Sequence, residues 1–184
     1  MTTETLPAPA AETKPPLELA PITWVAVFVA VVVCTLKFGF SGDAVVGSIF
    51  AAALVVLTAT DLERRIIPNR VVLPASAIVL LLNIAVHPSH ALEWIVAAAA
   101  SFAFFLAVAL INPKGLGMGD VKLAFLIGAG LGWDVVAALI LGTFAAALYA
   151  VILVLTRPGA SGKTAFALGP FLAGAAVVVL LLAH

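Results

Sequence analysis

Residues Gly117–Trp133 read Gly-Met-Gly-Asp-Val-Lys-Leu-Ala-Phe-Leu-Ile-Gly-Ala-Gly-Leu-Gly-Trp, a glycine-rich turn followed by a short apolar segment. One carboxylate, Asp120, stands where the turn meets the apolar residues. A second acid, Asp61, ends another apolar run, in the sequence Thr-Ala-Thr-Asp-Leu-Glu-Arg-Arg-Ile-Ile-Pro-Asn. Acids in long apolar segments are rare and commonly functional. The two aspartates are therefore the first candidates for a functional site.

The composition is that of an integral membrane protein. Apolar residues make up 64% of the chain and charged residues 10%, and the mean hydropathy is +1.26. Soluble globular proteins contain roughly 45–50% apolar and 25% charged residues. The lone cysteine, Cys34, excludes an intrachain disulfide and a Cys-x-x-Cys zinc module.

Long apolar runs alternate with short polar breaks, which predicts an all-α, polytopic helical fold. Lipid-facing barrel strands would instead alternate apolar and polar residues. We predict seven spans, at Ile22–Phe38, Ala44–Thr60, Val71–Val86, Leu92–Ile111, Asp120–Trp133, Val135–Leu155 and Phe166–Ala183. Residues 1–21 contain five prolines and few large apolar groups, which predicts a disordered cytoplasmic tail before a transmembrane domain at residues 22–184.

The distribution of basic residues predicts the orientation in the membrane, because Lys and Arg collect in cytoplasmic loops. Alternate breaks hold one set of eight, namely Lys14, Arg64, Arg65, Arg70, Lys114, Lys122, Arg157 and Lys163. The other set holds Lys37 alone. We therefore expect a cytoplasmic N-terminus, which places Asp61 and Asp120 together at the cytoplasmic boundary. The predicted fifth span covers only about 20 Å of a roughly 30 Å hydrocarbon core, so Asp120 is expected in a water-accessible cavity below the headgroups.

Either aspartate alone is explained by an ordinary interfacial or capping role. Two carboxylates at one boundary, however, can share a proton and activate a water held between them, as in aspartic proteases. No metal is required for this chemistry. His87 and His90 lie in a Pro-containing outer loop without a further ligand pattern, so we interpret them as solvated side chains. Trp24, Trp94 and Trp133 lie near span ends and are interpreted as interfacial anchors.

The surroundings of the two acids suit a peptide-binding site. Gly115, Gly117 and Gly119 are expected to adopt turns closed to other residues and to let a bound peptide approach. Pro68 should end the segment that begins with the second span, and Asn69 is a natural N-cap for the third. Gly128 and Gly132, four residues apart, predict a face for close helix packing.

The chain resembles the type IV prepilin peptidases, bacterial membrane aspartic endopeptidases that remove leader peptides from pilins and pseudopilins. The resemblance spans about residues 45–175 and rests on four features. These are Asp61 shortly before Pro68-Asn69, the run Gly117-Met118-Gly119-Asp120-Val121-Lys122, the Ile-Gly-Ala-x-Leu-Gly-Trp pattern that ends at Trp133, and Leu-Gly-Pro-Phe-Leu-Ala-Gly with Gly169 and Pro170.

The resemblance implies a GxGD-type intramembrane aspartic protease architecture with Asp61 and Asp120 as catalytic acids. It implies no cofactor, a prepilin or pseudopilin precursor with a hydrophobic N-terminal helix as substrate, and the bacterial inner membrane as location. The pilus assembly machinery is a further expected partner, and no nucleic acid is. Long family members carry a cysteine-rich insert and also methylate the new N-terminus, and nothing here corresponds to that insert. The chain is therefore similar to the short tight-adherence (Flp) pilus peptidases, while archaeal preflagellin peptidases and other short members stay open as alternatives.

A different class of function stays open, namely a channel, transporter or proton-relay protein that uses the paired aspartates. The position of both acids at one boundary and the lack of an internal repeat count against it.

Overall fold

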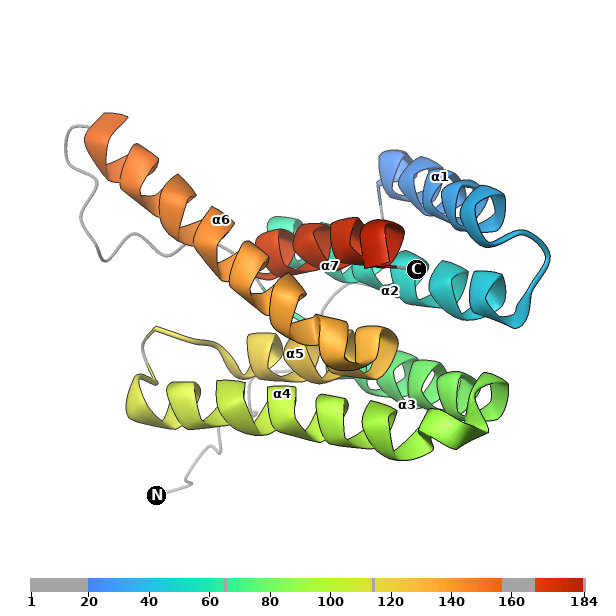
Figure 1. Ribbon diagram of the computed structural model, residues 1–184. Coiled ribbons are helices and arrows are strands. Elements are labelled where there is room, and N and C mark those ends of the chain that lie inside the picture. The colour runs from blue at the N-terminus through green and yellow to red at the C-terminus, as the bar shows by residue number, and fades with distance from the viewer. Residues whose placement is uncertain (1–19, 65, 114, 157–167, 184) are drawn as a thin grey trace, which may run out of the picture.

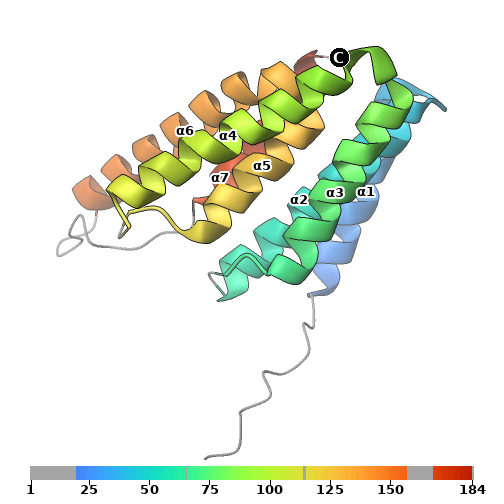
Figure 2. The same cartoon turned by 90° about the horizontal axis from the view of Figure 1, so that it is seen from below.

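The computed structural model describes residues 20–64, 66–113, 115–156 and 168–183. These residues form α-helices and no β-strand, which confirms the predicted all-α class. The α-helices are α1 (Pro21–Phe38), α2 (Gly42–Arg64), α3 (Asn69–Val86), α4 (Ala91–Ile111), α5 (Met118–Leu131), α6 (Val135–Thr156) and α7 (Gly169–Ala183). Short 3₁₀ turns at Pro88–His90 and Gly132–Asp134 precede α4 and α6. Figure 1 shows the helices packed into one bundle, and Figure 2 shows α1, α2 and α3 on one side of it with α4, α5 and α6 on the other.

Proline and glycine set several helix ends. Helix α1 begins at Pro21, where the ring lacks an N–H that a first helical turn does not need. It ends at Gly39, which has a φ of 65°. The break between α2 and α3 contains Pro68, which directly precedes α3 in an extended conformation. This agrees with the prediction that Pro68 ends the segment that begins with the second span.

Helix α5 is the centre of the bundle. It packs against α3, α4, α6 and α7, and almost every residue from Val121 to Leu131 is buried. The Asn83 side chain of α3 donates a hydrogen bond to the Ala129 carbonyl oxygen of α5 at 2.8 Å. A helix that is apolar all round is suited to such a position, because no face of it has to meet water.

Gly128 makes the closest approach between α4 and α5. A Cβ atom there would lie 2.7 Å from Ala98 Cα and 2.8 Å from the Ala97 carbonyl oxygen. Gly132 ends α5 with a φ of 57°. It also lies close to α4, since a Cβ atom there would be 3.1 Å from the Trp94 ring. Both glycines of the predicted packing face therefore approach α4 closely, and Gly132 is in addition the helix terminator.

Five helical segments are long and apolar enough to cross a membrane by length and composition, in the part of the chain that the structure describes. One of them, Met118–Thr156, joins α5 to α6, and α7 is a shorter apolar helix. Helix α5 has 14 residues, about 21 Å of a roughly 30 Å hydrocarbon core. The structure confirms a polytopic helical membrane protein, and the number of seven crossings stays a prediction.

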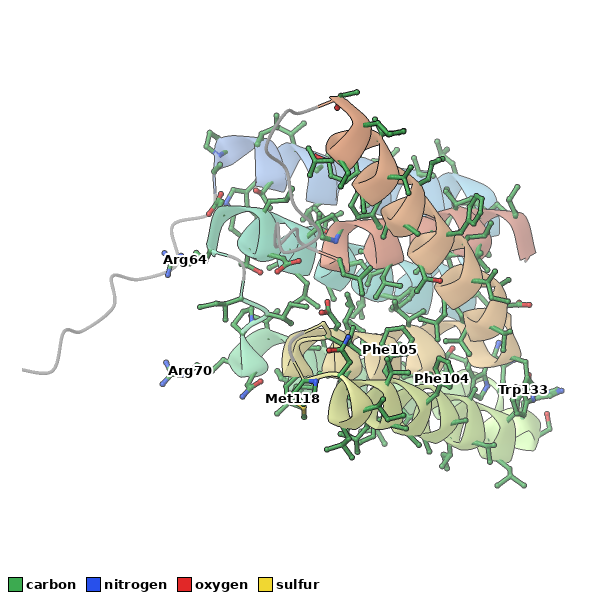
Figure 3. The ribbon with its side chains drawn as sticks, turned by 90° about the vertical axis from the view of Figure 1, so that its left-hand side faces the viewer. Arg64, Arg70, Phe104, Phe105, Met118 and Trp133 are labelled. Atoms are coloured by element: carbon green, nitrogen blue, oxygen red, sulfur yellow. The ribbon has the colours of Figure 1, made fainter. Side chains whose placement is uncertain are left out.

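Arg64 and Arg70 lie at one end of the bundle, together with Met118, whereas Trp133 lies at the opposite end (Figure 3). The end of α2, the start of α3 and the start of α5 therefore meet at the same end. Lys37, the lone basic residue of the other set, donates a hydrogen bond to the Leu181 carbonyl oxygen near the end of α7. The predicted disordered tail lies outside the described residues except for Ala20 and Pro21, as do Lys14, Arg65, Lys114, Arg157 and Lys163.

Candidate active site

Asp61 lies in the last turn of α2 and is buried, with 7% of its surface exposed. Its Oδ2 atom has no hydrogen-bond partner among the described residues. Buried polar atoms in native proteins almost always have a partner, from the protein or from water. This oxygen faces the start of α7, where a Cβ atom on Gly169 would lie 2.6 Å from it.

Asp120 occupies the third position of α5, whose N-cap is Gly117. The Asp120 backbone N–H donates to the Gly117 carbonyl oxygen at 3.1 Å, and the Gly117 backbone N–H faces the Asp120 carboxylate in return. Asp120 therefore lies in the first turn of α5, at the helix end that favours negative charge.

The two aspartates line one cavity of about 390 Å³. They are close enough for their charges to interact. The other residues of the wall come from the α2–α3 connection, the first turn of α3 and the start of α5, and they are Ile66, Ile67, Pro68, Asn69, Gly117, Met118, Gly119 and Lys122. The structure therefore joins both candidate acids and six of the eight supporting residues in a single cavity.

The remaining two, Gly169 and Pro170, begin α7. The Gly169 backbone N–H faces the Asp61 carboxylate, and a Cβ atom on Gly169 would lie only 2.6 Å from Asp61 Oδ2. Glycine is required here for close approach, because any side chain would displace either the carboxylate or the start of α7. Pro170 faces the neighbouring apolar groove between α2 and α7 and not the cavity.

Ile67 is the important residue that the sequence reasoning missed. It is buried in the α2–α3 connection and packs against Gly119, where a Cβ atom would lie 3.0 Å from Ile67 Cβ. The Ile67 Cδ1 atom is also 3.6 Å from the Cβ position of Gly169. The Ile67 side chain thus lies next to two segments, the start of α5, which carries Asp120, and the start of α7, which faces Asp61. The signal that could have found it is the apolar pair Ile66-Ile67 directly before Pro68, in a connection between two helices.

The prediction about the glycines near Asp120 is wrong. Gly115, Gly117 and Gly119 do not adopt left-handed turns, since the described glycines with positive φ are Gly39 and Gly132. Gly117 is extended, with a φ of −77°, and Gly119 is helical. The absence of a side chain matters at Gly119 because Ile67 packs directly onto it.

Asn69 does not cap α3, because Pro68 is the N-cap and no side chain makes a capping hydrogen bond there. Its Oδ1 atom instead accepts a hydrogen bond of 2.6 Å from Lys122 Nζ of α5. The contact joins the first turn of α3 to α5 beside the cavity. It explains why an amide and an ammonium group occur at these two positions, which their distance in the sequence does not reveal.

The opposite end of the bundle holds the outer-loop histidines. The His87 and His90 side chains meet solvent, as predicted, and His87 Nε2 also lies 2.7 Å from Asp43 Oδ1. Trp94 is buried, with its ring stacked against His87, and the prediction of an interfacial anchor is wrong for this residue. Trp24 and Trp133 are exposed, as an anchor requires.

The amino-acid sequence of this chain is similar to those of known proteins. The type IV leader peptidase family model matches residues 48–155, more than half of the chain. The prepilin leader peptidase/N-methyltransferase of Bacillus subtilis (strain 168) is 33% identical over 128 residues, which cover 66% of this chain and 49% of that protein. The chain thus spans about half the length of this curated relative. No match was found among solved structures.

Asp61, Asp120 and the whole of α3, α4 and α5 lie inside the range that the family model matches. On this evidence, the chain belongs to the type IV leader peptidase family.

Proposed function

We propose that the chain is an aspartic endopeptidase that removes the leader peptide from type IV prepilin-like precursors, with Asp61 and Asp120 as its catalytic acids. The observation that carries the proposal is that these two acids, on the different helices α2 and α5, line one cavity at one end of the bundle. Family membership and the named relative support the same reaction.

The proposed chemistry needs only the two carboxyl groups and a water molecule. One ionised carboxylate takes a proton from the water as its oxygen attacks the scissile carbonyl carbon, while the protonated partner donates to the carbonyl oxygen. The tetrahedral intermediate then collapses, and a proton passes to the leaving amine. The attacking water is proposed to lie in the cavity that Asp61 and Asp120 both line.

The substrate is proposed to be a precursor whose short leader precedes an apolar helix, with cleavage after a small residue, usually Gly. A site at the end of a membrane bundle suits this substrate, because the leader stays in water while the helix stays in the membrane. We place the site at the cytoplasmic face of the inner membrane, with a cytoplasmic N-terminus. Arg64 and Arg70 at the same end support this orientation.

Cleavage is proposed to occur without N-methylation. The sequence has one cysteine, Cys34, and it is buried in α1. Purified protein supplied with a precursor and S-adenosylmethionine should give a shortened product without a methyl mass increment. A methylated product would refute this part of the proposal.

The proposed function is tested with Asp61→Asn and Asp120→Asn in a membrane assay that follows shortening of a matched prepilin. Both variants keep the shape of the side chain but cannot perform the acid and base steps. Wild type should shorten the precursor. Each variant should accumulate in the membrane but leave the precursor intact. The matched control is Glu63→Gln, which removes an exposed carboxylate two residues from Asp61 and should stay active.

The outcomes separate the two classes of function. Near-normal processing by either Asn variant would exclude that residue as a catalytic acid. If wild type never cleaved a precursor but Asp61 and Asp120 controlled ion flux in liposomes, the channel or proton-relay function would replace the peptidase.

A further inference from the structure

An apolar groove runs along the bundle between α1, α2 and α7. It comprises two adjoining hollows of about 430 and 380 Å³, which share Ile22, Ala26 and Val177 in their walls. Helix α2 forms the floor, and α1 and α7 form the two sides (Figure 1). Its lining holds no charged residue within the described part of the chain.

The groove starts beside the two-aspartate cavity. Leu62 and Pro170 line its first hollow, and they directly follow Asp61 and Gly169 in the sequence. Gly169 touches Asp61 from one side, so the first turn of α7 separates the groove from the cavity. A chain lying in the groove would therefore have one end next to the helical turn that contacts Asp61.

The groove has the length and the open space to receive one face of a helix. Its floor runs from Ala51 to Leu62 on α2, about 16 Å at 1.5 Å per residue. Gly174, on the α7 side, has no atom within 4 Å of the position of a Cβ. Small side chains, such as those of Ala26 and Ala59, let another helix come close.

We propose that this groove binds the apolar helix of the precursor, with the N-terminal end of that helix toward Asp61. The inference rests on the proposed function and assigns a place to its substrate. The orientation follows because the leader precedes the helix in the precursor, so the bond to be cut must lie at the end of the groove beside Asp61. The hollows hold the side chains of one helix face, and the rest of that helix stays in lipid.

The family model matches the floor of the groove but not its two walls. The floor on α2 lies inside the matched residues 48–155, whereas α1 and α7 lie outside them. In this proposal the bound helix contacts side chains of all three helices, α1, α2 and α7. Lipid acyl chains are the competing occupant, because they fill any apolar groove in a membrane.

The test fills the groove with Gly174→Leu. The open space at Gly174 means that the new side chain causes no clash in the protein itself. The matched control, Ala147→Leu, adds the same bulk on an exposed position of α6, away from the groove. For a full-length precursor in detergent or liposomes, Gly174→Leu should raise KM at least tenfold with kcat little changed, and Ala147→Leu should leave both unchanged.

A second substrate, a soluble peptide that spans the cleavage site but lacks the apolar helix, separates docking from damage to the catalytic site. Wild type and Gly174→Leu should cleave this peptide equally slowly. Equal KM values for the full-length precursor would overturn the groove proposal, and so would an equal loss on both substrates.

Crosslinking keeps the groove testable if the proposed function fails. A photo-reactive amino acid at Ala26, in an Asp61→Asn background, should form an adduct with the precursor's apolar helix, and the same probe at Ala147 should not. Adducts with lipid alone at Ala26 would show that lipid occupies the groove. If wild type cleaved no precursor while the Ala26 adduct formed, the chain would bind the helix without the proposed peptidase activity.

Discussion

Gly169→Ala is expected to impair catalysis far more than folding. The added Cβ would lie 2.6 Å from Asp61 Oδ2, about 0.8 Å short of the 3.4 Å at which ordinary contact begins. Either the carboxylate or the first turn of α7 has to move by roughly that amount. A displacement of about 1 Å in a catalytic group can reduce the rate on the order of 100-fold.

We therefore expect kcat for precursor cleavage to fall between roughly 10- and 100-fold, which corresponds to about 1.4–2.7 kcal/mol of lost transition-state stabilisation. Stability should change little, because alanine favours helix over glycine by up to about 1 kcal/mol and so offsets part of the strain at the helix start. KM should also change little, because the displaced group acts on the scissile bond and not on the apolar helix.

The assay compares initial rates of precursor shortening by purified wild type, Gly169→Ala and Gly47→Ala, with thermal unfolding measured on the same samples. Gly47 is a matched control because it also lies in a helix, and its added Cβ would meet Phe38 at an ordinary 3.4 Å. Full activity of Gly169→Ala would refute the close contact between α7 and Asp61. An equal loss in Gly47→Ala would show that the effect is a general response to glycine replacement.

Four further expectations follow from contacts described above. Ile67→Ala should lower stability by about 2 kcal/mol and reduce cleavage, because it opens a void against Gly119, while Ile111→Ala at an exposed position should do neither; unchanged thermal unfolding and cleavage would contradict the bridging role. Lys122→Met and Asn69→Leu should show a coupling of roughly 1 kcal/mol in a double-mutant cycle of unfolding, and strict additivity would mean that their hydrogen bond contributes nothing. Gly128→Leu should cost at least about 2 kcal/mol in unfolding because backbone atoms of α4 cannot give way, whereas Ala145→Leu on the exposed face of α6 should be tolerated. In a Cys34→Ser background, a cysteine at Ser89 should react with an impermeant thiol reagent in intact cells and one at Ser161 only after the membrane is opened; labelling of both from outside would reverse the assigned orientation.

Much of the fold follows from patterns that are local in the sequence. Continuous apolar runs between polar breaks predict where helices occur, and the structure has a helix at each predicted span with ends that differ by a few residues. Pro68 predicts the break between α2 and α3 because its ring excludes helical geometry before it. The position of Asp120 in the first turn of α5 is equally local, since it follows the Gly117 N-cap by three residues.

The contacts between distant segments could not be read in the same way. Nothing in the order of residues tells that Asn69 accepts a hydrogen bond from Lys122, or that Gly169 touches Asp61. A glycine in a sequence is ambiguous because it can be needed either for a positive φ or for the close approach of another segment. Only the three-dimensional structure shows which of the two applies. Gly119 and Gly132 show this ambiguity, since Gly119 was expected to turn and is packed, while Gly132 was expected to pack and does so with a positive φ as well.

The contact between Gly169 and Asp61 also bears on how the protein is made. Helices α2 and α5 leave the ribosome before α7, so a partly synthesised chain already contains both acids but lacks the segment that closes around Asp61. Until α7 is inserted, the Asp61 carboxylate has no Gly169 N–H beside it and stays more open to water on that side. The contact between α7 and Asp61 thus forms only after both acids have been synthesised, so a chain cut before Gly169 would carry the two aspartates without this neighbour.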